Sequence, residues 1–414
     1  MTAWDTDTLG DAAVDLTEQL VRLDTVNPGL VAGAPGERAA VELLAARLEI
    51  AGFRCDVIAP QTHPDRPSLV ARHIGEGSGS GARERRKSLL LNGHLDTVGV
   101  GAMPDPFAAR IVGGRSTGRL EGRGSCDMKA GVAGMVVAAE AVAAAGVPGD
   151  IVLALVADEE HASLGSDAVI DWLRGRGELP TACVVGEPTW LDLALAHRGF
   201  AVVEVELRGK AAHSSQPGEG VNAVAHLGRL LAAVERYDHE LAARPAHPHA
   251  GRGSMLVTMA SGGTAPFSIP NSARAVVERR TVPGERAAEA LAEVERLVAA
   301  LWARDASVDA TCRLSLAREA WQVDGSAEST ELSGLLSAGL TAAGCAVPQC
   351  FGAPYWMESA LWQAAGVPTL VCGPAGGGLH ADDEWVDLRQ VRAYPGALAS
   401  AAAAFLRRPE MIGR

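Results

Sequence analysis

Histidines and carboxylates recur in this 414-residue chain at the points where short apolar runs end. The first example is the segment LNGHLDT at residues 91–97, which contains His94 and Asp96. Side chains two positions apart in an extended segment point to the same side. Asp96 is therefore expected to accept a hydrogen bond from one ring nitrogen of His94, leaving the other nitrogen free for a metal ion. Because a His-x-Asp pair occurs by chance in many loops, this segment alone is weak evidence.

Further acids and a second histidine lie at the ends of other predicted strands or at the start of a helix, namely Asp127, Glu159, Glu160, Glu187 and His380. In open α/β sheets, ligands bind at the edge formed by the carboxyl ends of the strands. Each position also has a purely structural interpretation. These are a helix N-cap for Asp127, a capping cluster for the adjacent glutamates, and an exposed turn or loop for Glu187 and His380.

Two histidines and several carboxylates form a suitable ligand set for two divalent metal ions that share one carboxylate. Imidazole together with carboxylate suits Zn²⁺, and Co²⁺ or Mn²⁺ are alternatives. Two ions roughly 3.5–4 Å apart can activate water and polarise a carbonyl group. Where two carboxylates are adjacent, as in Glu159 and Glu160, one can hold an ion while the other transfers protons. The sequence contains no serine nucleophile elbow, phosphate-binding loop or dinucleotide fingerprint that would favour another chemistry.

Alternating helices and strands are expected to position these residues. Apolar periodicity predicts helices at 11–26, 36–52, 130–145, 163–175 and 388–406, and strands at 53–58, 68–74, 151–157, 181–185 and 367–372. Such alternation is typical of a βαβ-type sheet. The segments 75–87 and 98–118 are rich in glycine and are predicted to be loops. The basic cluster of the first loop is interpreted as a solvated tip, and it comprises Arg83, Arg85, Arg86 and Lys87.

The pattern changes after residue 197. The run 199–208 alternates apolar and polar residues, which indicates a strand with one exposed face. The following segments predict a small α+β domain, with helices at 221–237 and 285–303 and strands at 255–261 and 273–280. We therefore expect a catalytic domain in two parts with a domain inserted between them, the three segments being 1–196, 197–316 and 317–414. An exposed sheet edge or helix of such an insertion is a natural dimer contact.

The composition narrows the class of protein. The chain is 48 % hydrophobic and 21 % charged, as in a soluble enzyme, and its formal net charge is −13. This acidic balance argues against nucleic acid and anionic membranes as partners. The N-terminus is acidic and lacks an apolar signal segment, and the seven cysteines form no Cys-x-x-Cys pair, so we expect a cytoplasmic protein. The apolar run 130–147 contains Glu140 and is predicted to be a buried helix.

Six segments together resemble one family. In family order they are NGHLDTV (92–98), GRGSCDMKAG (122–131), ADEEHASLGS (157–166), GEPT (186–189), GKAAHSSQP (209–217) and GPAGGGLHADDEWV (373–386). The chain resembles the di-zinc amidohydrolases and metallopeptidases that include aminoacylase, acetylornithine deacetylase, succinyl-diaminopimelate desuccinylase and glutamate carboxypeptidase. The resemblance implies an α/β fold. Its zinc-peptidase-like catalytic domain would have three layers, with an inserted α+β domain acting as lid and dimer contact.

The resemblance also implies a role for each site residue. Asp127 would bridge two metal ions, with His94 and Glu187 completing one site and Glu160 and His380 the other. Glu159 would be the general base that activates water and later returns the proton to the leaving amine. Asp96 would orient His94. His213, in the inserted domain, would reach the site of the partner subunit in a homodimer and steady the oxyanion.

The chain departs from the family pattern in the residues expected to contact substrate. Phe267 stands where the family often has asparagine, before the segment SIP at 268–270. The chain has Glu278-Arg279-Arg280 where the family often has Asp-x-Arg. Arg280 remains suited to bind a substrate carboxylate. The chain has Met357-Glu358 where the family often has Ser-Asp or Thr-Asp. Asn271 completes the predicted substrate contacts.

These features predict a metal-dependent hydrolase that cleaves the amide bond of a small N-acyl amino acid. A dipeptidase, a carboxypeptidase and an N-carbamoyl hydrolase of the same family are alternatives with the same chemistry. An alternative of another class is a ligand-binding protein without catalysis on the same scaffold.

Overall fold

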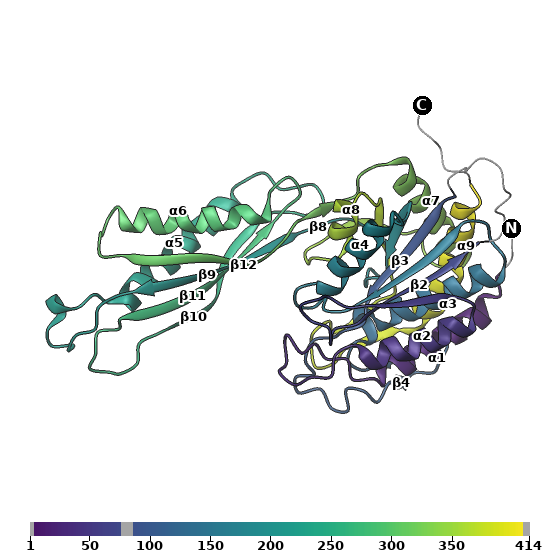
Figure 1. The fold of residues 1–414 in the computed structure, drawn as a ribbon, viewed down its shortest axis with the longest axis horizontal. Coiled ribbons are helices and arrows are strands. Elements are labelled where there is room, and N and C mark those ends of the chain that lie inside the picture. The colour runs from purple at the N-terminus through teal and green to yellow at the C-terminus, as the bar shows by residue number, and fades with distance from the viewer. Residues whose placement is uncertain (1–3, 76–85, 409–414) are drawn as a thin grey trace. The chain divides into compact units, whose positions relative to one another are not determined.

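The computed structural model describes residues 4–75 and 86–408 (Figure 1). They divide into two compact units. The first unit contains the chain up to Leu195, together with Val323–Phe351 and the residues from Met357 onward. The second unit contains Ala196–Gln322 and Gly352–Trp356. The range 197–316 predicted for the inserted domain lies wholly within the second unit.

A mixed sheet forms the centre of the first unit. Its strands run in the order β1 (Arg54–Ile58), β2 (Ser68–Ile74), β6 (Asp150–Val156), β3 (Ser88–His94), β7 (Ala182–Val185), β15 (Thr369–Val371) and β8 (Leu193–His197). The short strands β13 (Trp321–Gln322) and β14 (Cys350–Ala353) pair with β8. Strand β3 is parallel to both β6 and β7, so these three strands end at the same edge. Their side chains are almost entirely buried and apolar, as expected for central parallel strands.

Helices cover both faces of this sheet. One hydrophobic core joins a face of the sheet to α1 (Thr6–Val21), α2 (Arg38–Ile50), α3 (Ala130–Ala144), α7 (Ala327–Ala342) and α9 (Leu388–Leu406). Helices α4 (Leu164–Arg176) and α8 (Ser359–Ala364) contact each other and the sheet from outside this core. The predicted three-layer α/β architecture is confirmed.

A small sheet joins two distant segments of the first unit. Its strands are β16 (Gly376–Gly377), β17 (Trp385–Asp387), β5 (Arg119–Glu121) and β4 (Arg110–Val112), in that order. Strand β4 lies inside the range 98–118, which was predicted to be irregular. Because β17 pairs with β5, the loop between β16 and β17 lies next to the segment that follows β5. This pairing brings His380 close to Asp127.

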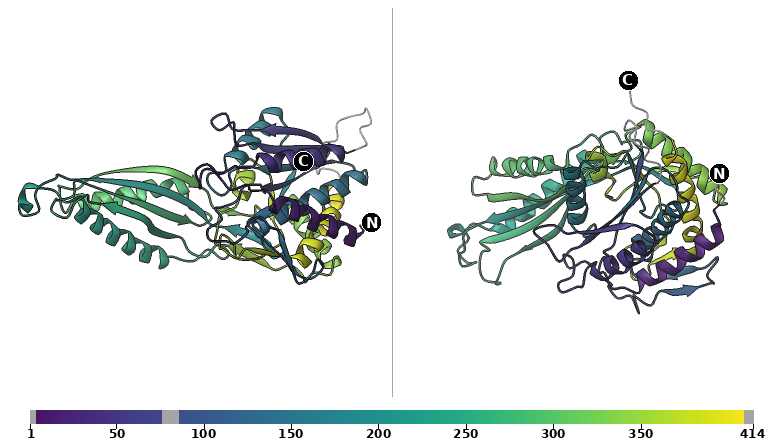
Figure 2. Two further views of the ribbon diagram at one scale, coloured as in Figure 1. Left: turned by 90° about the horizontal axis from the view of Figure 1, so that it is seen from below. Right: turned by 45° about the vertical axis from the view of Figure 1, so that its right-hand side comes forward.

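The second unit is a four-stranded antiparallel sheet with two helices on one face (Figures 1 and 2). The strand order is β10 (Ser254–Gly262), β11 (Ser272–Thr281), β9 (Gly199–Arg208) and β12 (Asp309–Arg318). Helices α5 (Ala223–Ala242) and α6 (Ala290–Trp302) bury the apolar positions of these strands, such as Val203 and Val277. Short 3₁₀ turns, η2 (Pro217–Glu219) and η3 (Ala287–Glu289), precede them. Strand β12 was not predicted.

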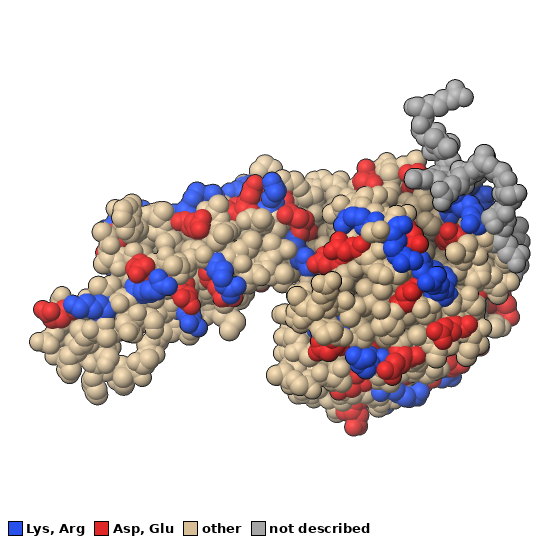
Figure 3. All heavy atoms as spheres, in the orientation of Figure 1, with Lys and Arg blue, Asp and Glu red and all other residues tan. Residues whose placement is uncertain are grey.

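Positive and negative side chains are interspersed on the face drawn in Figure 3. Among the described residues, no helix is long and apolar enough to cross a membrane. The predicted loop 75–87 lies largely outside the described residues, including Arg83 and Arg85. Lys87 was expected in its solvated tip and is instead buried, with its Nζ 2.6 Å from Glu331 Oε2 and 4.2 Å from the centre of the Phe405 ring.

Candidate metal centre

The predicted metal ligands meet at the carboxyl edge of the large sheet. His94 is the last residue of β3, Glu159 and Glu160 follow β6, and Glu187 follows β7. These three strands are neighbours and parallel, so their ends converge on one place. Asp127 comes from the turn η1 (Ser125–Lys129) that precedes α3. Its side chain points toward His94, and the N-cap interpretation is therefore not supported.

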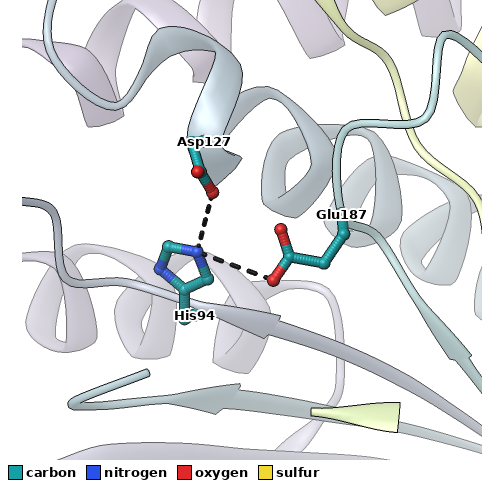
Figure 4. Close-up of side chains that lie close together, drawn as sticks. All are labelled: His94, Asp127 and Glu187. Carbon is teal, nitrogen blue, oxygen red and sulfur yellow. Dashed lines mark hydrogen bonds and ion pairs between the residues drawn. The ribbon is translucent and has the colours of Figure 1, made fainter. Parts of the chain in front are cut away.

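The first group of possible ligands is His94, Asp127 and Glu187 (Figure 4). His94 Nε2 lies 3.1 Å from Asp127 Oδ1 and 3.8 Å from Glu187 Oε1. All three ligand atoms lie within 4.8 Å of one another, and the His94 side chain is buried. One imidazole nitrogen and two carboxylate oxygens suit a divalent transition metal.

The second group is Asp127, Glu160 and His380. His380 Nε2 lies 3.1 Å from Glu160 Oε2 and 3.4 Å from Asp127 Oδ2. Asp127 therefore offers one oxygen to each group, as a carboxylate shared by two ions would. The residues present thus fit two divalent cations by number, chemistry and arrangement.

The neighbouring charges shift the pKa values of both imidazoles in the metal-free protein. Hydrogen bonds with Asp127 and Glu160 raise the pKa of His380 to about 10. Burial lowers the pKa of His94, but Asp127, Glu187 and Glu159 more than offset this, and its pKa is well above the ordinary value. The same imidazoles hold the pKa of Asp127 well below its usual range, although burial opposes them. Both histidines of the metal-free cluster are therefore expected to be protonated at neutral pH.

Glu159 lies beside the two groups and belongs to neither. Its Oε2 is 4.0 Å from His94 Nε2, and its side chain is only 10 % exposed. Burial raises its pKa well above the ordinary value, with Glu187 and Glu160 adding to the effect and His94 opposing it. A carboxylate with these properties is suited to accept and return a proton.

Comparison with known proteins identifies the family. Residues 90–404 match the model of the family described as Peptidase family M20/M25/M40. The chain belongs to this family. A succinyl-diaminopimelate desuccinylase from Dinoroseobacter shibae is 31 % identical over 319 residues, which cover 74 % of this chain and 78 % of that protein. An acetylornithine deacetylase from Myxococcus xanthus is 32 % identical over 290 residues, covering 67 % of this chain and 69 % of that protein.

Solved structures of M20 peptidases share the fold. A di-peptidase from Saccharomyces cerevisiae has a TM-score of 0.74 at 16 % identity, with 98 % of each chain covered. A dinuclear metal-binding peptidase from Bacillus subtilis has a TM-score of 0.69 at 14 % identity, covering 96 % of this chain and 99 % of that one. The family match and the relatives of 31–32 % identity show that this M20 chain is a hydrolase that acts on amide bonds.

The Asp96 side chain of the M20 chain does not make the hydrogen bond predicted for it. Its Oδ1 lies 3.7 Å from His94 Nδ1, whereas the backbone oxygen of Asp96 lies 3.0 Å from that nitrogen. The Asp96 carboxylate instead accepts the backbone N–H groups of Glu159 and Glu160, at 3.1 and 3.2 Å. The prediction was wrong because β3 ends at His94, so the side-by-side geometry of a strand no longer applies at residue 96.

Glu384 is a further residue of the M20 site, and no role was predicted for it. Its Oε1 accepts the N–H groups of Cys126 and Asp127, at 2.9 and 3.0 Å. Its Oε2 accepts Gly124 N–H at 2.9 Å and Arg123 Nη1 at 2.7 Å. Glu384 and Arg123 are each 1 % exposed. A buried acid with four donors therefore fixes the turn that carries Asp127.

The residues predicted to contact substrate are divided between the two units. His213, Phe267, Asn271 and Arg280 belong to the second unit, and Phe267 is 74 % exposed. Arg280 pairs with Glu278, and its guanidinium lies 5.4 Å from the centre of the Phe200 ring. Glu358 belongs to the first unit and is 1 % exposed, with its pKa raised to about 7 by burial.

Proposed function

We propose that this protein is a metal-dependent deacylase that hydrolyses the amide bond of a small N-acyl amino acid. The observation that carries the proposal is the pair of ligand groups joined by Asp127, with the free carboxylate of Glu159 beside them. The relatives named as a desuccinylase and a deacetylase support this substrate class over other amides.

Two divalent ions, with Zn²⁺ the best match to the ligands and Co²⁺ or Mn²⁺ as alternatives, would polarise the substrate carbonyl and lower the pKa of a water molecule. Asp127 would contribute one oxygen to each ion. His94 and Glu187 would complete the first site, and Glu160 and His380 the second. Because His94 is buried and His380 is 54 % exposed, we expect substrate to approach from the His380 side.

Glu159 would act as the general base and then as the general acid. Its carboxylate would accept a proton from the attacking water while the new C–O bond forms. It would return that proton to the leaving amine as the C–N bond breaks, so that no net proton is consumed by the enzyme. Its raised pKa favours both steps, since a base with an ordinary pKa near 4 would hold the proton too weakly to deliver it.

The second unit would provide the dimer contact and part of the substrate site. Strand β10 lies at the edge of its sheet, and it exposes Leu256 and Met259 at 53 % and 67 %. We propose that His213 of this unit serves the site of the partner subunit, and that Arg280 and Asn271 contact the substrate, with Phe267 nearby. A cytoplasmic location is proposed as well, because all seven cysteines are free thiols.

The decisive experiment measures release of free amine from N-succinyl, N-acetyl and N-carbamoyl amino acids and from dipeptides, with and without a chelator. We expect chelator-sensitive release, fastest from an N-acyl amino acid. Preference for a dipeptide or an N-carbamoyl substrate would instead support those alternatives.

The variant Glu159→Gln tests the base in the same assay. It should reduce kcat by about 10²- to 10⁴-fold while two ions remain bound per chain, because Glu159 belongs to neither ligand group. The matched control is Glu42→Gln on the exposed face of α2, which should behave as the wild type. Full activity in Glu159→Gln would refute the assigned role.

A further inference from the structure

Glu159 and Glu160 are adjacent in sequence but take part in different contacts. Glu159 lies near His94, whereas Glu160 contacts His380. Both backbone N–H groups are held by one carboxylate, since Glu159 N–H donates to Asp96 Oδ1 and Glu160 N–H to Asp96 Oδ2. The direction of both side chains therefore depends on the orientation of the Asp96 carboxylate.

The Asn27 side chain in turn holds Asp96. Its Nδ2 lies 2.7 Å from Asp96 Oδ2 and 3.1 Å from Asp158 Oδ1, so the two hydrogens of one amide link two carboxylates. Asn27, Asp96 and Asp158 are each 0 % exposed. The amide itself is fixed, because Asn27 Oδ1 accepts Gly29 N–H at 2.8 Å and Asn27 N–H donates to the Thr97 oxygen at 2.9 Å.

Arg66 supports the same chain of contacts from the other end. Its Nη1 lies 2.9 Å from Asp158 Oδ1, and its Nε lies 3.0 Å from Glu37 Oε2. Glu37 also accepts the backbone N–H of Asp158 at 3.3 Å. Asp158 has a φ of 70°, in the left-handed region that residues other than glycine rarely adopt, and it directly precedes Glu159. The buried ion pairs thus hold an unusual backbone conformation next to the proposed base.

We propose that Asn27 and Arg66 are positioning residues, which act through Asp158 and Asp96 to aim Glu159 and Glu160 in their two directions. Without the Asn27 amide, two buried carboxylates would lose a shared donor. Asp96 would then turn toward another partner and release the backbone of the two glutamates. This inference rests on the proposed function only where it assigns Glu159 as the base. Its consequence for the cation contacts of Glu160 is independent of the substrate.

The test is a titration of metal-free Asn27→Ala with Co²⁺, followed by absorption spectroscopy. We expect the first equivalent to bind as in the wild type, because His94 and Glu187 are untouched. The second should bind about 10- to 100-fold more weakly, as is typical when a residue behind a ligand is lost. Glu160→Gln provides the reference for a weakened second site. With substrate, kcat should fall by a similar factor while KM is unchanged.

The matched control is Asn222→Ala, which removes the N-cap of α5 in the second unit. It lowers stability without touching the cation ligands, so its Co²⁺ titration and kcat should match the wild type. If Asn27→Ala does not fold, Asn27→Ser and Arg66→Lys keep part of the donor set and should show the same ordered loss, less strongly. Wild-type Co²⁺ binding in a folded variant, or equal weakening of both sites, would overturn the proposal. The titration needs no substrate, so failure of the deacylase assignment leaves its outcome interpretable.

Discussion

Glu384 offers a sharp test of how the turn carrying Asp127 is held. Each oxygen of this carboxylate accepts two N–H donors, and the four donors belong to Arg123, Gly124, Cys126 and Asp127. In Glu384→Gln one oxygen becomes an NH₂ group. Whichever way the new amide turns, two donors then face a donor instead of an acceptor. The charged Arg123 should retain the remaining oxygen, so Cys126 and Asp127 should lose theirs.

The expected loss of folding stability follows from the number of hydrogen bonds that are lost. Each hydrogen bond to a charged group contributes about 1.5–3 kcal/mol, so two lost bonds cost about 3–6 kcal/mol. Arg123 also loses its full counter-charge while it stays buried, which keeps the loss toward the upper end of this range. A domain of ordinary stability has about 5–15 kcal/mol in total, so the variant should fold but be marginal. With its backbone N–H unpaired, Asp127 should shift and weaken binding at both cation sites.

Denaturant unfolding of the metal-free variant, together with metal analysis after dialysis, measures both effects. Glu121→Gln is the matched control in the small sheet next to Glu384, because Glu121 pairs with Arg110 and Arg119 at the surface. Those side chains are 71 % and 48 % exposed, so the control should change stability by less than about 1 kcal/mol. A Glu384→Gln protein as stable as the control, with both ions retained, would refute the reasoning.

Two further predictions concern the ions themselves. The pKa of His380 is raised to about 10 by its hydrogen bonds with Asp127 and Glu160, so a binding ion must displace a proton throughout the neutral range. The affinity of the protein for the ion should therefore keep rising with pH between about 7 and 8.5, where an ordinary imidazole with a pKa near 6.5 would give a plateau. A calorimetric titration that finds this plateau would contradict the reasoning. Asp127→Asn should weaken both ions because Asp127 belongs to both groups, whereas Glu187→Gln should weaken one, and metal analysis that finds equal losses in the two variants would contradict the shared role.

The parts of this protein that were predictable from sequence are those with local patterns. An apolar run followed at once by acids located the ends of β6 and β7 and hence Glu159, Glu160 and Glu187. The alternation in 199–208 gave the bounds of β9. Strand β12 was not predicted, although its apolar residues Ala310, Cys312, Leu314 and Leu316 alternate with polar ones as in a half-exposed strand. Glu358 is 1 % exposed, and its burial could not be predicted because sequence alone does not reveal which carboxylates are buried.

The residues behind the ligands have no comparable local signal. Glu384 lies 257 positions from Asp127, and Asn27 lies 69 positions from Asp96. Their partners are backbone N–H groups and charged side chains, which are present along the whole chain. Only an Asn-Pro pair at 27–28 marks a turn, and a turn signal carries no information about what its side chain will contact. Contacts of this kind depend on the complete fold.

Glu384 and Asp96 support the site in the same way, through the backbone, and this leaves the ligand side chains available to cations. Neither carboxylate forms a hydrogen bond with a ligand side chain; each accepts backbone N–H groups, Glu384 from Asp127 and Asp96 from Glu159 and Glu160. A ligand fixed through its main chain keeps all its carboxylate lone pairs free for an ion. Substitutions in these supporting acids should therefore misplace a ligand without removing it, and cause smaller losses of ion affinity than replacement of a ligand itself.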